Sequence, residues 1–323
     1  MLKKLKNWLK RNTGLQSLSD KSKDIWHQVV SGQKQVIATI RQENEEQLFV
    51  SGQTLVRLQT MMPEPNNLQE AEFKVYSQWG EDGIIQYLIK KCNIQPHTFI
   101  EFGVENFLEA NCRFLLKHNN WKGLIIDGSA QNMDYVKADS ISWRHDLTSL
   151  AAFITKENIN DLFVKAGFTG KIGILSVDID GNDYWVWDAI KVVDPVMVIA
   201  EYNSYFGRDR AISVPYDPSF YRTAAHFSNL YFGASLAALC HLAEQKGYAF
   251  VGCTTAGNNA FYVKKEHLNG LKSLSVEEGY VESLARESRD KDGKLTFIGG
   301  DDRLKLINGL PVVNVKTGAM ETL

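Results

Sequence analysis

Five short apolar runs alternate with helix-like segments between residues 98 and 200, and two more strands follow around a tight turn. The expected strands comprise residues 98–102, 122–126, 141–145, 171–179, 195–200, 249–254 and 259–265. Strands that alternate with helices pair in parallel, because each crossover helix packs back on a face of the sheet. The turn at residues 255–258 reads Thr-Ala-Gly-Asn, which favours an antiparallel hairpin. We therefore expect a doubly wound α/β sheet with a terminal antiparallel hairpin, and helices at residues 107–118 and 235–246.

Residues 20–62 form a different kind of segment, rich in Gln, Glu and Lys, with apolar residues at nearly heptad spacing. The apolar positions are Trp26, Val30, Ile37, Ile40, Leu48, Leu55 and Leu58, and the polar ones in the same seam are Gln33, Asn44 and Ser51. This pattern predicts a coiled coil that joins copies of the chain into a homo-oligomer. A long helix packed on its own domain is the alternative. Pro63 and Pro65 end the helix, so we divide the chain into a helical arm with linker (1–67), an α/β domain (68–265) and a C-terminal extension (266–323).

The first eleven residues form a basic amphipathic helix in this interpretation, with Leu2, Leu5, Trp8 and Leu9 on one face and lysines on the other. Such a helix can lie on an anionic membrane surface, and a solvated terminus is the alternative. No run reaches the ~18 apolar residues of a membrane-spanning helix, and the start lacks the apolar stretch of a signal peptide. We therefore expect a cytoplasmic protein, with peripheral contact at the inner face of the membrane left open.

Charge and cysteine usage narrow the class of protein further. The net charge of −2 provides no overall attraction to nucleic acid, so no nucleic-acid partner is expected. Four cysteines are widely spaced and form no CxxC pair. That pattern is typical of buried thiols in a reducing cytoplasm and not of a disulfide framework or a zinc site.

Polar residues stand where each of the five expected parallel strands ends. They are Glu101 and Gly103, Asp127, Asp146, Asp178 and Asp180, and Glu201 and Asn203. In open α/β sheets, ligands bind beyond these carboxyl ends, near the point where the strand order reverses. Capping of the following helices would account for some of these residues. Their presence at all five ends predicts a small-molecule site.

Individual positions suggest which ligand this site holds. An acid after the second strand, here Asp127, can grip a ribose diol, and Asp146 stands where an adenine amino group could donate. Gly103 lets the backbone approach the ligand, and the helix expected from Phe107 could point its amides at a carboxylate. Asp127 would serve NAD equally well, so an NAD-linked oxidoreductase is an alternative. The absence of GxGxxG after the first strand and the terminal hairpin speak against it.

Four motifs in order carry a family resemblance. Residues 76–82 read YSQWGED, 99–104 read FIEFGV, 121–127 read WKGLIID, and 174–183 read ILSVDIDGND. The segment from 76 to 265 resembles the FkbM-type methyltransferases, which implies a class I, Rossmann-like methyltransferase fold that uses S-adenosylmethionine. The residues that the resemblance assigns to the cofactor are Gln78, Glu101, Gly103, Asn111, Asp127 and Asp146. One departure is Glu105, which replaces the second glycine of the usual acid-x-Gly-x-Gly loop.

The acidic run Asp178–Asp183 invites a metal interpretation. Carboxylates two residues apart at a strand end, joined by an oxygen ligand from the next strand, suit Mg²⁺. The candidate ligands are Asp180, Glu201 and Asn203. The alternative is that these groups cap helices or bind the substrate directly.

The loop after the fifth strand, residues 204–233, is dense in aromatic residues and contains three arginines. Long ordered loops at this edge are commonly lids or substrate platforms. Aromatic rings stack on sugars, and arginines pair with phosphate or carboxylate. The candidate substrate contacts are Arg208, Arg210, Tyr216 and Tyr221, with a structural cover as the alternative. His226 is a candidate general base.

These features together predict an S-adenosylmethionine-dependent O-methyltransferase that acts on a sugar, nucleotide-sugar or glycan hydroxyl. Asp178, Asp180, Glu201 and Asn203, with His226, are the candidates for holding and deprotonating that hydroxyl. Besides the oxidoreductase, the alternative is a non-catalytic coiled-coil assembly protein whose methyltransferase-like domain only binds ligand, and Glu105 keeps that alternative open.

Overall fold

The computed structural model describes the backbone of residues 1–12 and 15–323, and it describes all side chains except those of residues 9–21, 34 and 38. The chain separates into two compact units, Met1–Ser51 and Gly52–Leu323. Helix α1 (Leu2–Asn12) and most of helix α2 (Leu15–Met61) belong to the first unit. The division into residues 1–67, 68–265 and 266–323 stays a prediction.

The first unit exposes the apolar residues of the expected seam. Trp26 is 61% exposed, Ile37 50% and Ile40 51%, which is far more than a buried helix face would show. On α1, Leu2, Leu5 and Trp8 are likewise exposed, and the side chain of Leu9 lies outside the described side chains. A coiled-coil partner for α2 and a membrane surface for α1 both stay predictions. Among the described helices, none combines the length and apolar character needed to cross a membrane.

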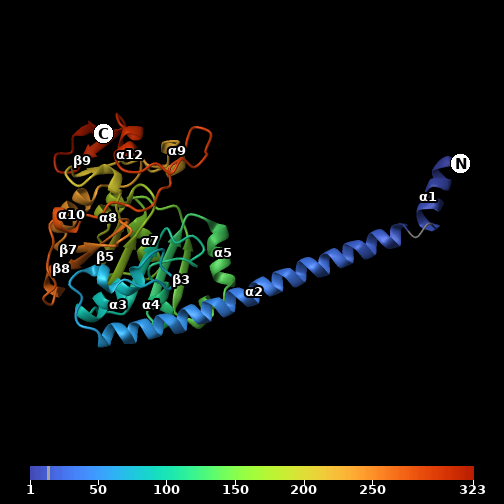
Figure 1. Ribbon diagram of the computed structural model, residues 1–323, viewed down its shortest axis with the longest axis horizontal. Coiled ribbons are helices and arrows are strands. Elements are labelled where there is room, and N and C mark those ends of the chain that lie inside the picture. The colour runs from blue at the N-terminus through green and yellow to red at the C-terminus, as the bar shows by residue number, and fades with distance from the viewer. Residues whose placement is uncertain (13–14) are drawn as a thin grey trace. The chain divides into compact units, whose positions relative to one another are not determined.

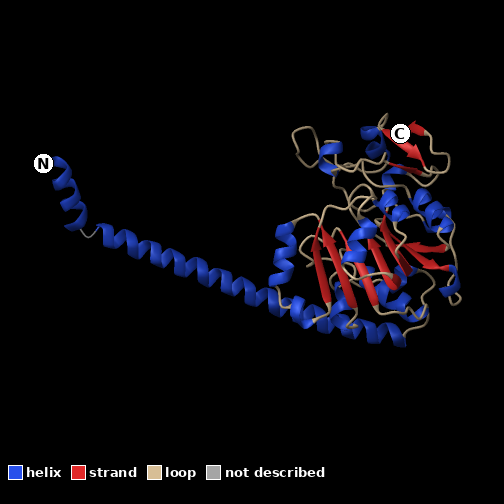
Figure 2. Ribbon diagram, turned by 180° about the vertical axis from the view of Figure 1, so that it is seen from behind, coloured by secondary structure: helices blue, strands red, loops and turns tan. Residues whose placement is uncertain are grey.

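The second unit is built on a seven-stranded sheet (Figures 1 and 2). Its strands are β1 (Thr98–Phe102), β2 (Lys122–Asp127), β3 (Leu147–Ala151), β4 (Gly170–Val177), β5 (Val193–Glu201), β7 (Tyr248–Cys253) and β8 (Asn259–Lys264). They lie in the order β3-β2-β1-β4-β5-β8-β7, and β8 runs antiparallel to both of its neighbours. The expected doubly wound sheet with a terminal hairpin is confirmed, and this strand order is that of class I methyltransferases. The order reverses between β1 and β4, so ligands are expected at that point.

The central strands are buried on both faces because the side chains that point to either face of the sheet are apolar. Phe99 packs in one core layer, while Ile100 and Phe102 pack in the layer on the opposite face. Helices cover both faces (Figure 2). One layer contains residues of α7 (Ile159–Lys165), α8 (Asp183–Ala189) and α10 (Leu236–Gln245). The other contains residues of α3 (Glu81–Lys91), α4 (Arg113–His118) and α5 (Ala130–Ala138).

The expected third strand was wrong. Residues Ile141–Arg144 form helix α6, and β3 begins only at Leu147. The carboxylate of Asp139 accepts a hydrogen bond from the Ile141 N–H over 2.8 Å and so helps to start a helical turn. Because β3 begins after Asp146, this residue lies at the amino end of the strand and not at its carboxyl end.

The expected helix 107–118 begins later than predicted, at Arg113. Glu105 and Phe107 adopt positive φ angles of 48° and 60°, which a helix cannot accommodate. The carboxylate of Glu101 accepts the backbone N–H groups of Asn111 at 2.7 Å and Cys112 at 2.9 Å. These bonds hold residues 103–112 as an irregular loop above β1.

The C-terminal extension folds onto the loop that follows β5. Helices α11 (Val276–Gly279) and α12 (Asp301–Ile307) are followed by β9 (Pro311–Asn314) and β10 (Met320–Thr322). The last two strands form a three-stranded sheet with β6 (Ile212–Ser213), in the order β10-β9-β6 (Figure 1). This sheet joins the C-terminal extension to the loop after β5.

Candidate functional site

A cavity of about 540 Å³ opens at the carboxyl ends of β1, β2 and β4, and we call it the large cavity. Its walls include Gly103, Glu105, Asp127, Asn132, Phe153, Ile154, Asp178, Asp180, Tyr221, Arg222 and Glu287. Its volume falls within the ~300–1,000 Å³ typical of small-molecule sites. The reversal of strand order therefore coincides with a space of the right size for a cofactor.

Asp127 closes β2 at the wall of the large cavity. One carboxylate oxygen accepts the Glu105 N–H over 2.8 Å. The other accepts the Ser129 N–H at 2.8 Å and the Asn132 side-chain amide at 3.3 Å. A carboxylate has about four lone-pair positions, so one remains to receive a hydroxyl of a bound ligand.

Gly103 is required by the close approach of two loops. Its φ is +75°, and a Cβ at this position would lie 1.6 Å from the carbonyl oxygen of Asp178. Only glycine lets the loop after β1 pack against the end of β4. Glu105 follows in the same loop, and its backbone N–H binds Asp127 while the residue lines the large cavity.

Glu101 and Asn111 hold this loop by hydrogen bonds. Neither residue lines the large cavity. Glu101 is 4% exposed, and burial raises the pKa of its carboxyl to about 7, against the opposing effect of its backbone hydrogen bonds. The side-chain amide of Asn111 donates to the Ser176 hydroxyl over 3.1 Å. Both residues thus shape the backbone near the site, and their assignment to the cofactor stays a prediction.

Asp146 lies at the opposite edge of the sheet from the large cavity. Its carboxylate is 3.9 Å from the Lys122 ammonium, and its side chain is 69% exposed. Its backbone oxygen accepts the Gly123 N–H at the start of β2. The expected contact with an adenine group is therefore wrong, because the third strand begins after this residue. Phe153 and Ile154, which follow β3, line the cavity instead and offer an apolar wall.

Three carboxylates gather where β4 and β5 end. One oxygen from each of Asp178, Asp180 and Glu201 lies within 4.8 Å of the other two. Burial raises the pKa of Asp178 and Glu201 well above the usual range, and the neighbouring carboxylates raise it further. Within the described part of the chain, Oε2 of Glu201 has no hydrogen-bond partner. Such an oxygen can accept a proton from a ligand hydroxyl.

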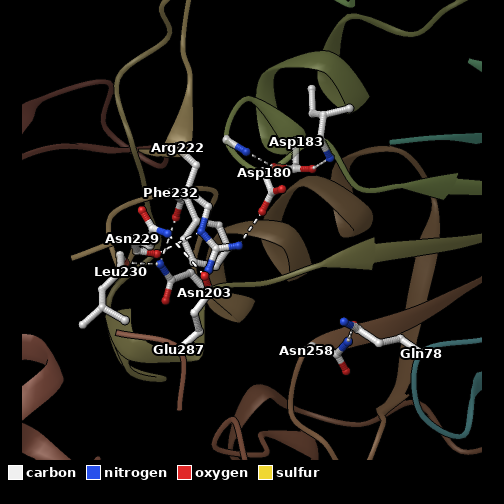
Figure 3. Close-up of polar contacts among 12 residues, drawn as sticks. Gln78, Asp180, Asp183, Asn203, Arg222, Asn229, Leu230, Phe232, Asn258 and Glu287 are labelled. Atoms are coloured by element: carbon white, nitrogen blue, oxygen red, sulfur yellow. Dashed lines mark hydrogen bonds and ion pairs between the residues drawn. The ribbon is translucent and has the colours of Figure 1, made fainter. Parts of the chain in front are cut away.

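The loop after β4 owes its shape to Asp183, which stands at the start of α8. The carboxylate of Asp183 accepts the N–H groups of Ile179 at 2.7 Å and Gly181 at 2.9 Å (Figure 3). These bonds leave Asp180 with a φ of 55° and turn it toward the other two carboxylates. Asp183 is thus a structural residue of the DIDGND motif and is fully buried.

Arg222, at the start of α9 (Arg222–Ala225), places a positive charge beside this cluster. Its Nη1 donates to Oδ1 of Asp180 over 2.5 Å, and its Nε donates to the Asn229 carbonyl over 2.9 Å (Figure 3). The guanidinium carbon lies 3.8 Å from the centre of the Phe232 ring. Arg222 is not among the residues predicted from the sequence, because nothing in its local sequence distinguishes it from the other arginines of this loop.

Asn203, one of the predicted metal ligands, is held by hydrogen bonds of its side-chain amide. Both hydrogens of the Asn203 amide are donated to the carbonyls of Leu230 and Phe232, each over 2.9 Å (Figure 3). Its oxygen accepts the Tyr205 N–H over 2.9 Å. Asn203 thus caps the short helix η2 (Ser204–Phe206), it lines the small cavity, and its role as a metal ligand stays a prediction. Asp178 is a further carboxylate beside Asp180 and Glu201. These three oxygens suit Mg²⁺ by type and proximity, although Arg222 already supplies positive charge to them.

A second, smaller cavity of about 100 Å³ lies next to the large one, and we call it the small cavity. Its walls include Gln78, Trp79, Glu201, Tyr205, Phe232, Asn258, Ser283 and Glu287. Arg222 and Glu287 line both cavities and therefore stand between them. Gln78, expected at the cofactor, faces the small cavity, where its side-chain oxygen accepts from Asn258 over 3.4 Å (Figure 3).

The other predicted substrate contacts lie in several places. Tyr221 lines the large cavity. Tyr216 hydrogen-bonds Glu157, and Arg210 pairs with Glu321 on β10 over 2.7 Å, so both hold the loop in place. Arg208 is exposed and lines neither cavity.

His226 is also absent from both cavity walls, and its Nδ1 lies 2.7 Å from the Ser228 hydroxyl. The structure therefore favours a carboxylate over His226 as the group that could accept a proton at the site.

No family model matches the chain, and no curated protein matches it. Among solved structures, the N-terminal domain of EvdMO1 with SAH bound is 10% identical, with a TM-score of 0.38 over 65% of this chain and 94% of that one. An S-adenosylmethionine-dependent methyltransferase from Clostridium acetobutylicum is 11% identical, with a TM-score of 0.36 over 56% of this chain and 88% of that one. The CurJ carbon methyltransferase is 9% identical, with a TM-score of 0.37 over 61% of this chain and 57% of that one. At these scores the strand order of the sheet, and not the likeness, identifies the fold.

Proposed function

We propose that this chain is an S-adenosylmethionine-dependent O-methyltransferase of the FkbM type that methylates a sugar hydroxyl. The observation that carries the proposal is the position of the acidic cluster. Asp178 and Asp180 line the large cavity, and Glu201 lines the small cavity, although their oxygens lie within 4.8 Å of one another. A proton acceptor thus stands between a space suited to a cofactor and a polar space suited to an acceptor.

The residues of the large cavity fit S-adenosylmethionine. Asp127 retains a lone-pair position for a ribose hydroxyl, and Phe153 and Ile154 offer an apolar surface for the adenine ring. When bound, the cofactor supplies the methyl group on a sulfonium centre. Asp178 and Asp180 place carboxyl oxygens on the wall of the cavity, and such oxygens favour a positively charged centre there.

The small cavity supplies the acceptor side of the proposal. Trp79, Tyr205 and Phe232 offer rings on which a sugar can stack, and Gln78 and Asn258 offer amides for its hydroxyls. Methyl transfer is an in-line displacement, so these residues act mainly by positioning the hydroxyl oxygen. Glu201 accepts the hydroxyl proton on Oε2 as the oxygen becomes a nucleophile. Burial among carboxylates raises the pKa of Glu201 and makes it a better proton acceptor.

Mg²⁺ is a second candidate for the positive charge at this cluster. Asp178, Asp180 and Glu201 would hold it, and it would lower the pKa of the attacking hydroxyl. The bond from Arg222 to Asp180 opposes this arrangement, because the guanidinium occupies one side of the same carboxylate. We therefore propose that the enzyme works without a metal.

Calorimetric titration with SAH, the demethylated cofactor, tests the proposal. Micromolar binding is expected, and Asp127→Ala should weaken it about 10- to 100-fold, because one hydrogen bond from a ribose hydroxyl to a carboxylate contributes roughly 1.5–3 kcal/mol. Asp134→Ala, on the exposed face of α5, is the matched control and should leave binding unchanged. Binding of NAD instead would contradict the proposal, and binding of neither would favour the non-catalytic assembly protein.

A further inference from the structure

The C-terminal extension forms part of the wall on the acceptor side of the site. Ser283, Ala285 and Glu287 all line the small cavity, and Glu287 lines the large cavity as well. These residues lie far along the chain from β5, and nothing in their local sequence predicts a place at the site.

Arg303 on α12 holds this segment in place. Its Nη1 donates to the Ser283 carbonyl and its Nη2 donates to the Ala285 carbonyl, each over 3.0 Å. Its Nε donates to the Ile298 carbonyl over 3.2 Å, and the side chain is only 5% exposed. A buried guanidinium is stable only when its donors are paired, so these bonds fix the backbone of residues 283–287 in this conformation. The guanidinium carbon also lies 4.8 Å from the ring centre of Tyr205, another wall of the small cavity.

The side chains that line the small cavity include two carboxyl groups and one guanidinium. Glu201 and Glu287 line it, and Oε1 of Glu287 accepts a bond from the Asn229 amide over 3.3 Å (Figure 3). Arg222 is the one cation among the described wall residues, and its guanidinium is bound to Asp180. Arg289 lies 3.4 Å from Glu287 but is not a wall residue.

The arginines that could have held an anionic substrate face elsewhere. Arg210 is paired with Glu321, and Arg208 lies outside both cavity walls. An anionic group in the small cavity would therefore meet the Glu287 carboxylate, while the one cation among the described wall residues, Arg222, is bound to Asp180. The charge of the wall disfavours a uronate or a sugar phosphate.

We propose that residues 283–287 form the acceptor-recognition wall, and that Glu287 makes it select a sugar that carries an amino group over one that carries a carboxylate. This inference rests on the proposed function, because it takes the small cavity as the acceptor side. Glu287 is the specificity-determining residue, since it can pair with an ammonium and repel a carboxylate. Arg303 is a positioning residue that acts through the carbonyls of Ser283 and Ala285.

Three methyl glycosides of one ring geometry test the selection: methyl glucosaminide, methyl glucoside and methyl glucuronide. Each is titrated calorimetrically into the full-length chain saturated with SAH. We expect binding to weaken in that order, with about tenfold or more between the amino and the uronate ligand. Glu287→Gln should reduce this ratio to less than about threefold, and Glu287→Lys should reverse it. Glu277→Gln, on the exposed face of α11, is the matched control and should keep the wild-type ratio.

Arg303→Met tests the positioning role. It should weaken all three glycosides about tenfold or more while the SAH affinity stays within about threefold of wild type, because the wall loosens but the large cavity remains. An unchanged SAH affinity also shows that the variant is folded.

The inference is overturned if the glucuronide binds as tightly as the glucosaminide, if Glu287→Gln keeps the wild-type ratio, or if the SAH-saturated chain binds none of the three. A chain that does not bind SAH at all would instead reject the proposed function, so the two failures can be told apart.

Discussion

The Arg222 guanidinium donates to the Asp180 carboxylate over 2.5 Å and joins α9 to the turn after β4, which lies 42 residues earlier in the chain. This pair places a fixed positive charge beside three carboxylates that would otherwise repel one another. It also stands at the boundary of the two cavities, since Arg222 lines both. The cluster is thereby neutralised in part by the chain itself.

The first prediction concerns metal binding. Titration of Mg²⁺ into the wild-type chain should give no heat of site binding, because Arg222 already occupies the cluster. Arg222→Gln should bind Mg²⁺, since it removes the competing charge and leaves Asp178, Asp180 and Glu201 together. Arg208→Gln, in the same loop but outside both cavity walls, is the control and should behave as wild type. Tight Mg²⁺ binding by the wild-type chain would contradict this prediction.

The second prediction concerns the proton acceptor. Glu201→Gln keeps the shape of the side chain but removes its basicity, so turnover of a glycoside acceptor should fall about 10²- to 10⁴-fold. SAH affinity should change little, because Glu201 is not among the wall residues of the large cavity. Wild-type turnover should rise with pH through the raised pKa of Glu201, since only the ionised form accepts a proton. A variant that keeps wild-type turnover would exclude Glu201 as the base.

The third prediction concerns Gly103. Gly103→Ala should destabilise the fold by about 3 kcal/mol or more, because the new Cβ would clash with the Asp178 carbonyl. Gly167→Ala is the matched control: its φ is +79°, but no atom lies within 4 Å of the added Cβ. It should lose only the ~1 kcal/mol of backbone strain. Urea unfolding of both variants measures the difference, and equal losses would show that the close approach to β4 is unimportant.

The fourth prediction concerns pH and stability. Burial raises the pKa of Asp82 to about 6, although its carboxylate accepts bonds from Val75, Tyr76 and Ser77. The folded chain therefore holds this proton more tightly than the unfolded chain, and the contribution of Asp82 to stability declines as pH rises from about 4 to about 6. A shift of this size corresponds to roughly 3 kcal/mol.

Asp82→Asn should therefore flatten the dependence of the unfolding free energy on pH between about 4 and 6, as measured by urea unfolding at several pH values. Asp134→Asn should leave the wild-type slope in place, because Asp134 is exposed. An Asp82→Asn variant with an unchanged slope would show that Asp82 does not titrate in this range.

The fifth prediction concerns assembly. Ile37 and Ile40 are half exposed on α2 and occupy the expected seam, so the full-length chain should form a homo-oligomer in light scattering. The double substitution Ile37→Glu with Ile40→Glu should dissociate it and leave SAH affinity unchanged. Gln35→Glu adds charge outside the seam and should not dissociate it. A monomeric wild-type chain would reject the coiled coil.

Much of the α/β sheet can be predicted from the sequence, because its central strands carry apolar side chains on both faces of the sheet. Strands β1, β4 and β5 are buried on both faces and stand out as continuous apolar runs. Parallel strands have their carboxyl ends at the same edge of the sheet, so the sequence predicted that Asp178 and Glu201 would lie close together. The edge strand β3 was not, because its residues are only half buried and carry no comparable run.

The sequence by itself therefore determined the doubly wound sheet, its terminal hairpin and the strand-end acids, because local hydrophobic patterns encode which residues must be buried. Only the tertiary structure decided which polar groups meet at the site. Arg222, Glu287 and Arg303 come from segments outside the parallel strands. Asn203 donates to the carbonyls of Leu230 and Phe232, which lie almost 30 residues away in the chain. Contacts over such separations leave no local periodicity. They depend instead on how the loop after β5 and the C-terminal extension pack over the sheet edge.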